Sequence, residues 1–148
     1  MNTGFTIALS IILGLSCLLA ILGLVYSRIR KKLDILVADK FDKKDILGAT
    51  TRATFFGIKS KGGAQIRGNG ALVLTGNEIY FIRAVPQKEY KIPISSIRKV
   101  SMPRIFNGKS ALVPLLCIAY DTGYGEDSMA WAIKDAKKWK EKIEEMIA

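Results

Sequence analysis

Residues 70–100 read GALVLTGNEIYFIRAVPQKEYKIPISSIRKV, and this stretch decides the fold. Two short runs, 71–75 and 79–82, have a composition that favours strands, and the pair Gly76-Asn77 between them is typical of a turn. After a second, proline-containing reversal, apolar residues alternate with polar ones. Such alternation indicates strands with one face on a core and the other in water. We therefore predict three consecutive strands joined by short turns.

Period-two patterns continue on both sides of this stretch. We predict four further strands, at 52–58, 96–102, 111–120 and 128–133. The first of them is expected to turn Phe55 or Phe56 inward, and the glycine-rich residues 59–70 after it are typical of a long turn region. Residues 103–109 are expected to form a loop. The segment 111–120 is nearly all apolar, so we predict a buried central strand there, with a bulge or an edge at Pro114.

The chain closes with the pattern of an amphipathic helix. Asp135 is a residue type that often caps a helix N-terminus, and charged side chains cover one face of the segment that follows. The opposite face carries apolar side chains at helical spacing, namely Ala136, Trp139, Ile143, Met146 and Ile147. We predict a C-terminal helix that packs this apolar face on the sheet.

The order of these elements resembles that of a known superfold. Residues 72–81 follow the pattern L-x-L-T-x-x-x-I-x-F, and residues 92–100 follow I-P-I-x-x-I-x-x-V. Over residues 49–147 the chain resembles the pleckstrin-homology-like superfold, especially its GRAM and bacterial members. The resemblance implies a seven-stranded, strongly bent antiparallel sheet or barrel, capped by a C-terminal α-helix with Trp139 packed into the core near the helix start. We expect residues 49–148 to form this domain.

A long apolar segment precedes the domain. Residues 5–26 carry no charge, and about 20 such residues in a helix span a bilayer core of roughly 30 Å. A cleaved signal peptide would have a basic start, and a lipoprotein signal ending at Cys17 would not be followed by further apolar residues. We therefore predict that residues 1–27 form a retained transmembrane helix that crosses the membrane once.

The flanks of the apolar segment predict its orientation. Four basic residues follow it directly, while no charged side chain precedes it. The positive-inside rule then places the N-terminus outside the cell membrane and the C-terminal domain in the cytoplasm. Small residues at 10 and 14, and again at 16 and 20, would let two such helices approach closely, so a homo-oligomer is one open possibility.

Residues 28–48 form a basic amphipathic juxtamembrane segment. Apolar residues recur in it at helical spacing, among seven basic and four acidic side chains. A basic amphipathic helix can lie along an anionic membrane surface, but the interleaved aspartates weaken that interpretation. A spacer helix, or a helix packed on its own domain, fits the pattern equally well.

The residue types of an enzyme are missing. The sequence has no histidine, and no nucleophile-elbow, phosphate-loop or Cys-x-x-Cys motif. The only close carboxylates in the sheet region, Asp121, Glu126 and Asp127, flank a glycine-rich turn, where acidic residues are ordinary. The two cysteines, Cys17 and Cys117, sit in apolar patterns. We expect a protein without catalytic residues, cofactor or metal.

Charge patterning favours binding. The chain has 23 basic and 13 acidic residues, a formal net charge of +10. No acidic residue lies between Asp45 and Glu78, or between Glu89 and Asp121. The candidate residues for contacts with lipids or a partner lie in these two intervals and beside the apolar segment: Arg28, Arg30, Lys31, Lys32, Lys59, Lys61, Arg67, Arg104 and Lys109.

The resemblance also bears on lipid recognition. Phosphoinositide-binding members of the superfold use a basic residue at the end of the first strand and a Lys/Arg-x-Arg pattern at the start of the second. Lys59 and Lys61 match the first element loosely, whereas Arg67 stands without its paired base. We therefore expect a diffuse contact with anionic headgroups, to which each basic residue near the surface contributes about 1 kcal/mol.

Two functions follow from these observations. The first is a membrane-anchored, non-enzymatic binding module, an adaptor at the cytoplasmic membrane face that contacts anionic lipid headgroups, a protein partner or both. The alternative is an accessory or scaffold subunit of a larger membrane protein complex. Nucleic acid is disfavoured as a partner, because the aromatic residues follow core periodicity and are not interleaved with basic residues as stacking platforms.

Overall fold

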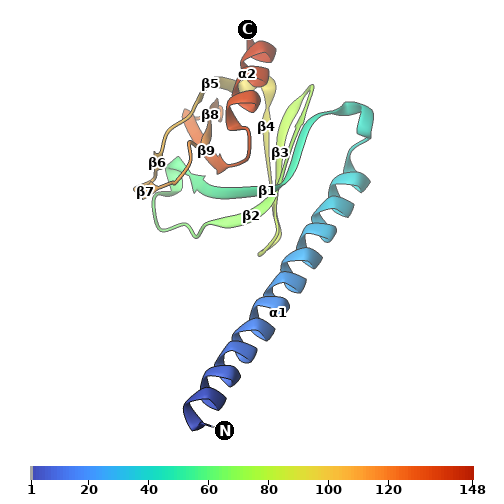
Figure 1. Cartoon of the computed structure of the whole chain (residues 1–148). Coiled ribbons are helices and arrows are strands. Elements are labelled where there is room, and N and C mark those ends of the chain that lie inside the picture. Colours follow the sequence, from blue (N-terminus) through green and yellow to red (C-terminus); the bar gives the residue numbers. More distant parts are fainter. Residues whose placement is uncertain (1) are drawn as a thin grey trace. The chain divides into compact units, whose positions relative to one another are not determined.

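The computed structural model describes residues 2–148, and the chain divides into two compact units. The first unit ends at Lys32 and the second covers Leu33–Ala148. The first helix, α1 (Thr3–Lys40), forms most of the first unit and continues into the start of the second (Figure 1).

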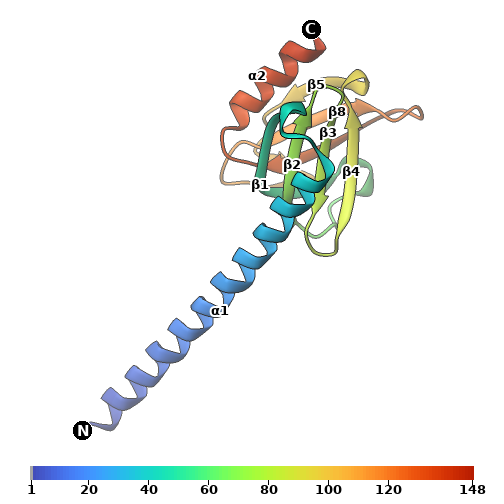
Figure 2. The same cartoon turned by 90° about the vertical axis from the view of Figure 1, so that its right-hand side faces the viewer.

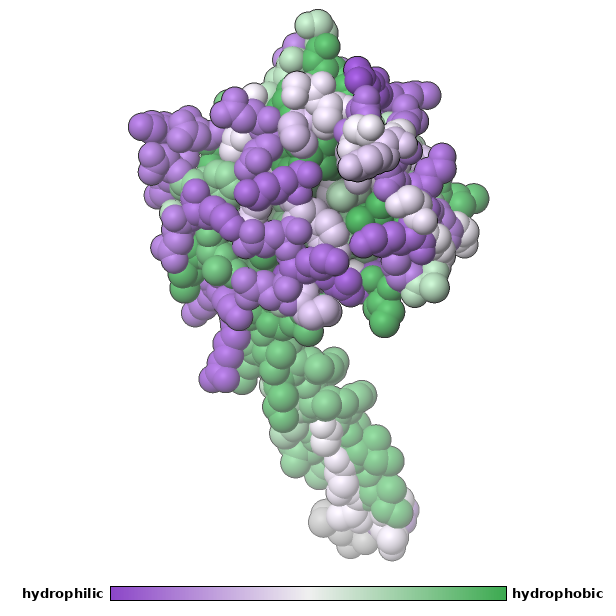
Figure 3. All heavy atoms as spheres, turned by 180° about the vertical axis from the view of Figure 1, so that it is seen from behind, coloured by the Kyte–Doolittle hydropathy of each residue, from purple (hydrophilic) through white to green (hydrophobic). Residues whose placement is uncertain are grey.

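The first unit is an apolar helix whose side chains are exposed. Figure 3 shows apolar side chains along the visible face of this helix. Ser10 and Ser16 donate their hydroxyl hydrogens to backbone carbonyls four residues earlier, at 2.9 and 2.8 Å, so these polar groups are satisfied within the helix. By length and composition alone α1 can cross a membrane, a property that a membrane anchor and a signal sequence share.

The second unit is built on one antiparallel sheet of seven strands. They are β1 (Ile46–Ile58), β2 (Gly68–Thr75), β3 (Glu78–Arg83), β4 (Lys88–Pro93), β5 (Ile97–Ser101), β8 (Leu116–Asp121) and β9 (Glu126–Ala132). Their order in the sheet is β4-β3-β2-β1-β9-β8-β5. Figure 2 shows β2, β3 and β4 side by side, and α2 (Ala136–Ile147) closes the chain. The seven antiparallel strands and the C-terminal helix confirm the prediction from sequence.

The sheet is open, and the prediction of a strongly bent sheet or barrel was wrong. Strands β4 and β5 stand at the two ends of the strand order, and each pairs with one neighbour only. The short 3₁₀ turn η3 (Ile94–Ser96) connects them, so no backbone ladder forms where closure would require one. The sheet is therefore neither closed nor strongly curled.

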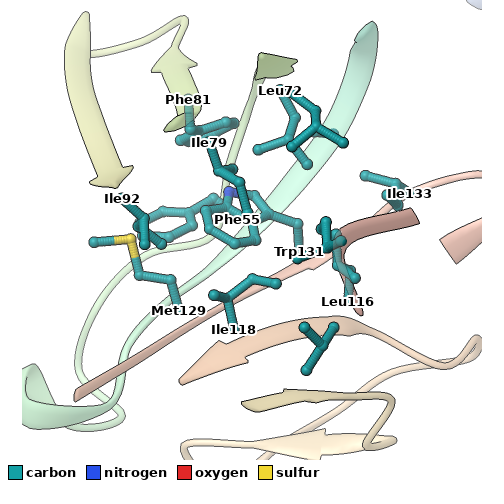
Figure 4. Packing of buried hydrophobic residues seen from close by; sticks show 14 of the residues in the cluster. Phe55, Leu72, Ile79, Phe81, Ile92, Leu116, Ile118, Met129, Trp131 and Ile133 are labelled. Atoms are coloured by element: carbon teal, nitrogen blue, oxygen red, sulfur yellow. The ribbon is translucent and has the colours of Figure 1, made fainter. Parts of the chain in front are cut away.

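The main core lies on one face of the sheet and draws on both halves of it. The Phe55 ring lies 5.1 Å from the Phe81 ring and 5.8 Å from the Trp131 ring, between centroids (Figure 4). Leucine and isoleucine side chains from β2, β3, β4 and β8 surround these rings. Ile143 of α2 is fully buried in the same cluster, and Trp139 packs against it while partly exposed. The apolar face predicted for α2 is thus the face that meets the sheet.

A second, smaller cluster covers part of the other face. Neighbouring residues of a strand point to opposite faces, so Phe56 faces away from the main core. It is buried with Phe106, Leu115, Cys117 and Ala130. Both phenylalanines are therefore buried, one on each face of the sheet.

The last turns of α1 pack on the outer face of β2 and β3. On these strands Ala71, Val73, Tyr80 and Ile82 point away from the main core and are nevertheless buried. Leu33 and Val37 are buried as well, and the Phe41 ring lies edge-on to the Tyr80 ring at 5.1 Å. The sequence left open whether the juxtamembrane helix lies along the membrane, acts as a spacer or packs on its own domain. Residues 33–41 pack on their own domain.

A polar contact secures these turns. The Lys40 Nζ donates hydrogen bonds to the Tyr80 hydroxyl at 2.5 Å and to the Glu89 carboxylate at 2.7 Å. The bond with Glu89 raises the pKa of Lys40, and the bond from Lys40 lowers the pKa of Glu89. Both groups are therefore charged over the whole range between the ordinary pKa values of glutamate and lysine. The contribution of Glu89 is complete above its ordinary pKa and is lost as pH falls through the lowered value.

The start of α2 differs from the prediction that the Asp135 side chain caps the helix. Asp135 has φ 58° and ψ 35°, and its side chain forms no capping hydrogen bond. A side-chain cap requires an extended backbone at that residue, whereas the left-handed conformation turns the carboxylate away from the first amides. Its backbone carbonyl instead accepts from the amides of Lys138 and Trp139.

We predict that Ile143→Ala lowers the free energy of unfolding of the second unit by about 2–5 kcal/mol, because the buried side chain leaves a cavity. Thermal unfolding followed by circular dichroism measures the change. Glu145→Ala on the exposed face of the same helix is the control and should change stability by less than about 0.5 kcal/mol. Equal effects of the two substitutions would contradict the packing of α2 described here.

We predict that Glu89→Gln at neutral pH speeds amide hydrogen exchange of residues 33–41 about two- to fivefold, since a partly exposed ion pair contributes roughly 0.2–1 kcal/mol. Hydrogen-exchange mass spectrometry of the full chain gives the rates. Glu126→Gln removes a carboxylate elsewhere on the sheet and should leave these amides unchanged. Unaltered exchange in Glu89→Gln would show that the apolar contacts alone hold the helix.

Candidate functional site

Five of the nine candidate residues lie on two neighbouring loops. Lys59, Lys61 and Arg67 belong to the connection from β1 to β2, and Arg104 and Lys109 belong to the connection from β5 to β8. The remaining four, Arg28, Arg30, Lys31 and Lys32, lie on α1 within the other compact unit. We refer to residues 59–67 and 103–115 as the loop pair (Figure 1).

Side-chain hydrogen bonds hold the two loops together. Arg67 donates from Nη2 to the Ser110 carbonyl at 2.9 Å, and Lys109 donates from Nζ to the Gln65 carbonyl. From the other side, the Asn107 amide donates to the carbonyls of Ile58 at 2.9 Å and Gly62 at 3.2 Å. Residues more than 40 positions apart in sequence therefore form one surface.

A tight hairpin presents Asn107 to the first loop. Strands β6 (Ile105–Phe106) and β7 (Lys109–Ser110) form a separate two-stranded ladder, and the pair Asn107-Gly108 joins them. Both turn residues have positive φ, 51° and 73°. Asn-Gly is the preferred pair for such two-residue turns, because both residues tolerate the left-handed conformation. The sequence predicted only a loop here, although the Asn-Gly pair was the available signal for a hairpin.

The five basic side chains of the loop pair have different roles. Arg67 and Lys109 are engaged in loop-to-loop bonds, and the Arg67 guanidinium also stacks on the Phe56 ring at 4.2 Å from its centroid. Lys59, Lys61 and Arg104 are exposed and, among the contacts that the structure gives for residues 2–148, none of the three takes part in an ion pair. These three are the side chains most able to reach a ligand.

The carboxylate of Asp127, which contacts the first loop, is tied into the protein. The Asp127 carboxylate accepts hydrogen bonds from the Ser60 amide at 3.0 Å and the Ser60 hydroxyl at 2.5 Å. Burial raises the pKa of Asp127, but hydrogen bonds from Ser60 and from the Ser128 amide outweigh it, so the net pKa is lowered. Asp127 is therefore an ionised anchor for the first loop and leaves the positive charge of Lys61 and Arg104 largely uncompensated.

A cleft of about 330 Å³ opens beside the loop pair. Its lining includes Lys59 and Lys99, the hydroxyls of Ser101 and Ser128, and Glu126. Cys117 also borders the cleft, and burial raises the pKa of its thiol, which keeps it protonated and weakly reactive. The cleft is lined by both signs of charge, and nothing in its geometry selects one ligand.

The exposed apolar side chains on the loop pair were not predicted from the sequence. The predicted strand at 111–120 starts only at Leu116, and Leu112 and Val113 lie in a loop with 98% and 50% of their surface exposed. Pro114 has no amide hydrogen for a sheet ladder, and the Leu115 amide donates instead to the Pro103 carbonyl at 2.8 Å. The strand prediction was therefore wrong for residues 111–115, and Pro114 was the signal for its later start.

The carboxylates near the β8–β9 turn do not converge on a metal site. Arg98 binds the Asp121 carboxylate at 2.8 Å, and this bond and the one from the Gly123 amide lower the pKa of Asp121. Throughout the part of the chain that the structure describes, no group of three or more metal-ligating side chains is brought together.

Comparison with known proteins adds no assignment, because no protein-family model matches this sequence and no curated protein matches it.

We predict that Asn107→Asp loosens the first loop, because a carboxylate cannot donate to the carbonyls of Ile58 and Gly62. Amides of residues 59–67 should exchange faster, and the free energy of unfolding should fall by about 1–3 kcal/mol. Asn77→Asp, in the turn between β2 and β3, is the matched control and should leave these amides unaffected. Unchanged protection in Asn107→Asp would mean that the side-chain bonds do not hold the loops together.

Proposed function

We propose that this protein is a membrane-anchored, non-enzymatic binding module whose loop pair contacts anionic lipid headgroups. The observation that carries the proposal is the joining of two sequence-distant loops into one surface. That surface presents Lys59, Lys61 and Arg104 on a domain that directly follows an apolar helix. An anionic membrane surface attracts such a cluster by about 1 kcal/mol per basic residue.

Within this proposal the domain is of the pleckstrin-homology-like, GRAM-related kind. The order of the seven strands, the terminal helix and the contact of Trp139 with the main core support that assignment. The open sheet departs from the strongly bent form of the superfold. The assignment therefore rests on topology and patterning.

The proposed topology is a single span with the N-terminus outside and residues 33–148 in the cytoplasm. Arg28, Arg30, Lys31 and Lys32 favour this orientation by the positive-inside rule and add basic charge at the same membrane face. Only six residues separate Tyr26 from Leu33, the first residue of the second unit. A tether this short keeps the domain at high effective concentration near the bilayer, so weak contacts are sufficient.

We propose no catalytic reaction at the loop pair. The sequence has no histidine to act as a general base near neutral pH. Burial raises the pKa of the Cys117 thiol, which borders the cleft beside the loop pair, so this thiol stays protonated. The side chains beside the loop pair are therefore suited to holding anions by charge and hydrogen bonds.

A second candidate function is an accessory or scaffold subunit of a larger membrane complex. The observation that favours it is α1, whose large apolar side chains are exposed and whose small residues at 10, 14, 16 and 20 would allow close helix contacts. This candidate predicts that replacing residues 5–26 by an unrelated apolar helix abolishes co-purification of a partner in mild detergent. The headgroup-binding function would survive that replacement.

The test is co-sedimentation of fragment 33–148 with phosphatidylcholine vesicles and with vesicles that contain phosphatidylglycerol. The fragment keeps the turns of α1 that pack on the sheet, and its thermal unfolding should be checked first. We predict binding that needs the anionic lipid, weakens as salt rises and falls about tenfold or more in Lys61→Glu/Arg104→Glu.

The control is Lys134→Glu/Lys138→Glu, which makes the same change of charge near α2, away from the loop pair (Figure 1). If both double variants lose binding equally, net charge and not the loop pair is responsible. Absence of binding to either kind of vesicle would overturn the proposed function.

A further inference from the structure

Four large apolar side chains project into solvent from the loop pair. The exposed fractions are 77% for Ile66, 66% for Ile105, 98% for Leu112 and 50% for Val113. The remaining exposed apolar side chains of the second unit, Ile35, Leu47, Val85 and Tyr124, lie on other elements. Removal of such side chains from water is favourable in proportion to their apolar area, so a group of four on one surface indicates an interaction surface.

Loop contacts bring these side chains to one end of the domain. The Arg67 bond to the Ser110 carbonyl places Ile66 beside the segment that leads to Leu112. Ile105 is the ladder partner of Ser110 in the hairpin. The four side chains therefore share the surface on which Lys61 and Arg104 are exposed.

The exposure of Leu112 and Val113 is fixed by the backbone on both sides of them. The Ala111 amide donates to the Arg104 carbonyl at 2.8 Å, and the Leu115 amide donates to the Pro103 carbonyl at 2.8 Å. Leu115 itself is fully buried in the smaller core cluster. Leu112 and Val113, two of the three residues between these anchor points, therefore stand out from the surface and cannot fold back into the core without breaking both bonds.

We propose that Leu112 and Val113, flanked by Ile66 and Ile105, insert into the boundary between headgroups and acyl chains of the anionic membrane. The inference rests on the proposed function and adds to it a second, apolar kind of contact. The charge pattern selects the bilayer as the occupant. No acidic residue lies between positions 46 and 77 or between 90 and 120, so the loop pair itself contributes only basic charge beside the apolar tip, while Glu126 and Asp127 of β9 border its first loop and the cleft.

Basic and apolar side chains on one surface complement each other in membrane binding. Basic side chains hold the surface near anionic headgroups, and apolar side chains gain free energy only when they pass beyond the headgroups. Insertion of Leu112 and Val113 would contribute less than complete burial, because the interface is only partly apolar, and a weak contribution is sufficient for a domain that is already tethered. A protein partner would have to match a positive rim, and a second copy of this chain would bring the same sign of charge.

The test uses the full chain, reconstituted in lipid nanodiscs large enough to hold two copies. A photo-crosslinking p-benzoylphenylalanine replaces Leu112 in one protein and Tyr124 in another. Tyr124 is the matched control, because it is also fully exposed but lies on the acidic turn between β8 and β9. After irradiation, mass spectrometry identifies adducts with lipid acyl chains, in nanodiscs of phosphatidylcholine alone and with phosphatidylglycerol added.

We expect lipid adducts at position 112 in several-fold higher yield than at position 124. Adducts at position 112 in both kinds of nanodisc would support insertion while arguing against a preference for anionic headgroups. Yields at position 112 no higher than at position 124 would overturn the inference, and the vesicle result for Lys61→Glu/Arg104→Glu would still decide the proposed function separately. Adducts with a second copy or another protein in place of lipid would also overturn it.

Both replaced side chains are exposed, so loss of folding is not expected. A second measurement guards against a local effect of the photo-crosslinker. Leu112→Ser/Val113→Ser removes apolar surface without changing the charge, so it should reduce binding of fragment 33–148 to anionic vesicles several-fold and leave the salt dependence of the remaining binding unchanged. Tyr124→Ser should have no effect. Equal binding of Leu112→Ser/Val113→Ser and the unmodified fragment would contradict insertion.

Discussion

The structure depends on a single long strand shared by two halves of the sheet. Backbone hydrogen bonds join β1 to β2 over its first part and to β9 over its last part. The register shifts between Phe55 and Gly57, and Gly57 has φ 117°, a conformation that favours glycine. At this shift Phe55 contacts aromatic rings from both halves. Because the first loop of the loop pair begins where β1 ends, this strand also sets the position of the candidate site.

Local patterning was sufficient to predict the strands of residues 70–100, the last strand and the C-terminal helix. In β4, β5 and α2 the period of apolar residues matches the exposure that the structure shows, whereas β2, β3 and β9 are buried on both faces and their apolar runs predict strands without predicting exposure. The open sheet was not predictable, because curvature depends on long-range pairing that no local pattern records. Asp135 shows the same limit, because aspartate is suited both to a side-chain cap and to a left-handed turn, and only the structure distinguishes the two.

The candidate site was predictable as a set of charges but not as a surface. Gaps in acidic residues pointed to Lys59, Lys61, Arg67, Arg104 and Lys109, and the structure brings these five onto adjacent loops. Their roles could not be foreseen, because Arg67 and Lys109 bind carbonyls of the facing loop. The apolar run 111–120 led to a wrong strand prediction for residues 111–115. A run of apolar residues is typical of a buried strand, and only Pro114 signalled that its first half stays outside.

A contact between the domain and the membrane is the central claim, and it can be mapped residue by residue. The most direct measurement is paramagnetic broadening of backbone amide resonances in the full chain, in nanodiscs that contain lipids with gadolinium-labelled headgroups. The account predicts the strongest broadening in residues 59–67 and 103–115, with α2 and the β8–β9 turn largely unaffected. Broadening centred on α2, or equal broadening over the whole domain, would contradict it.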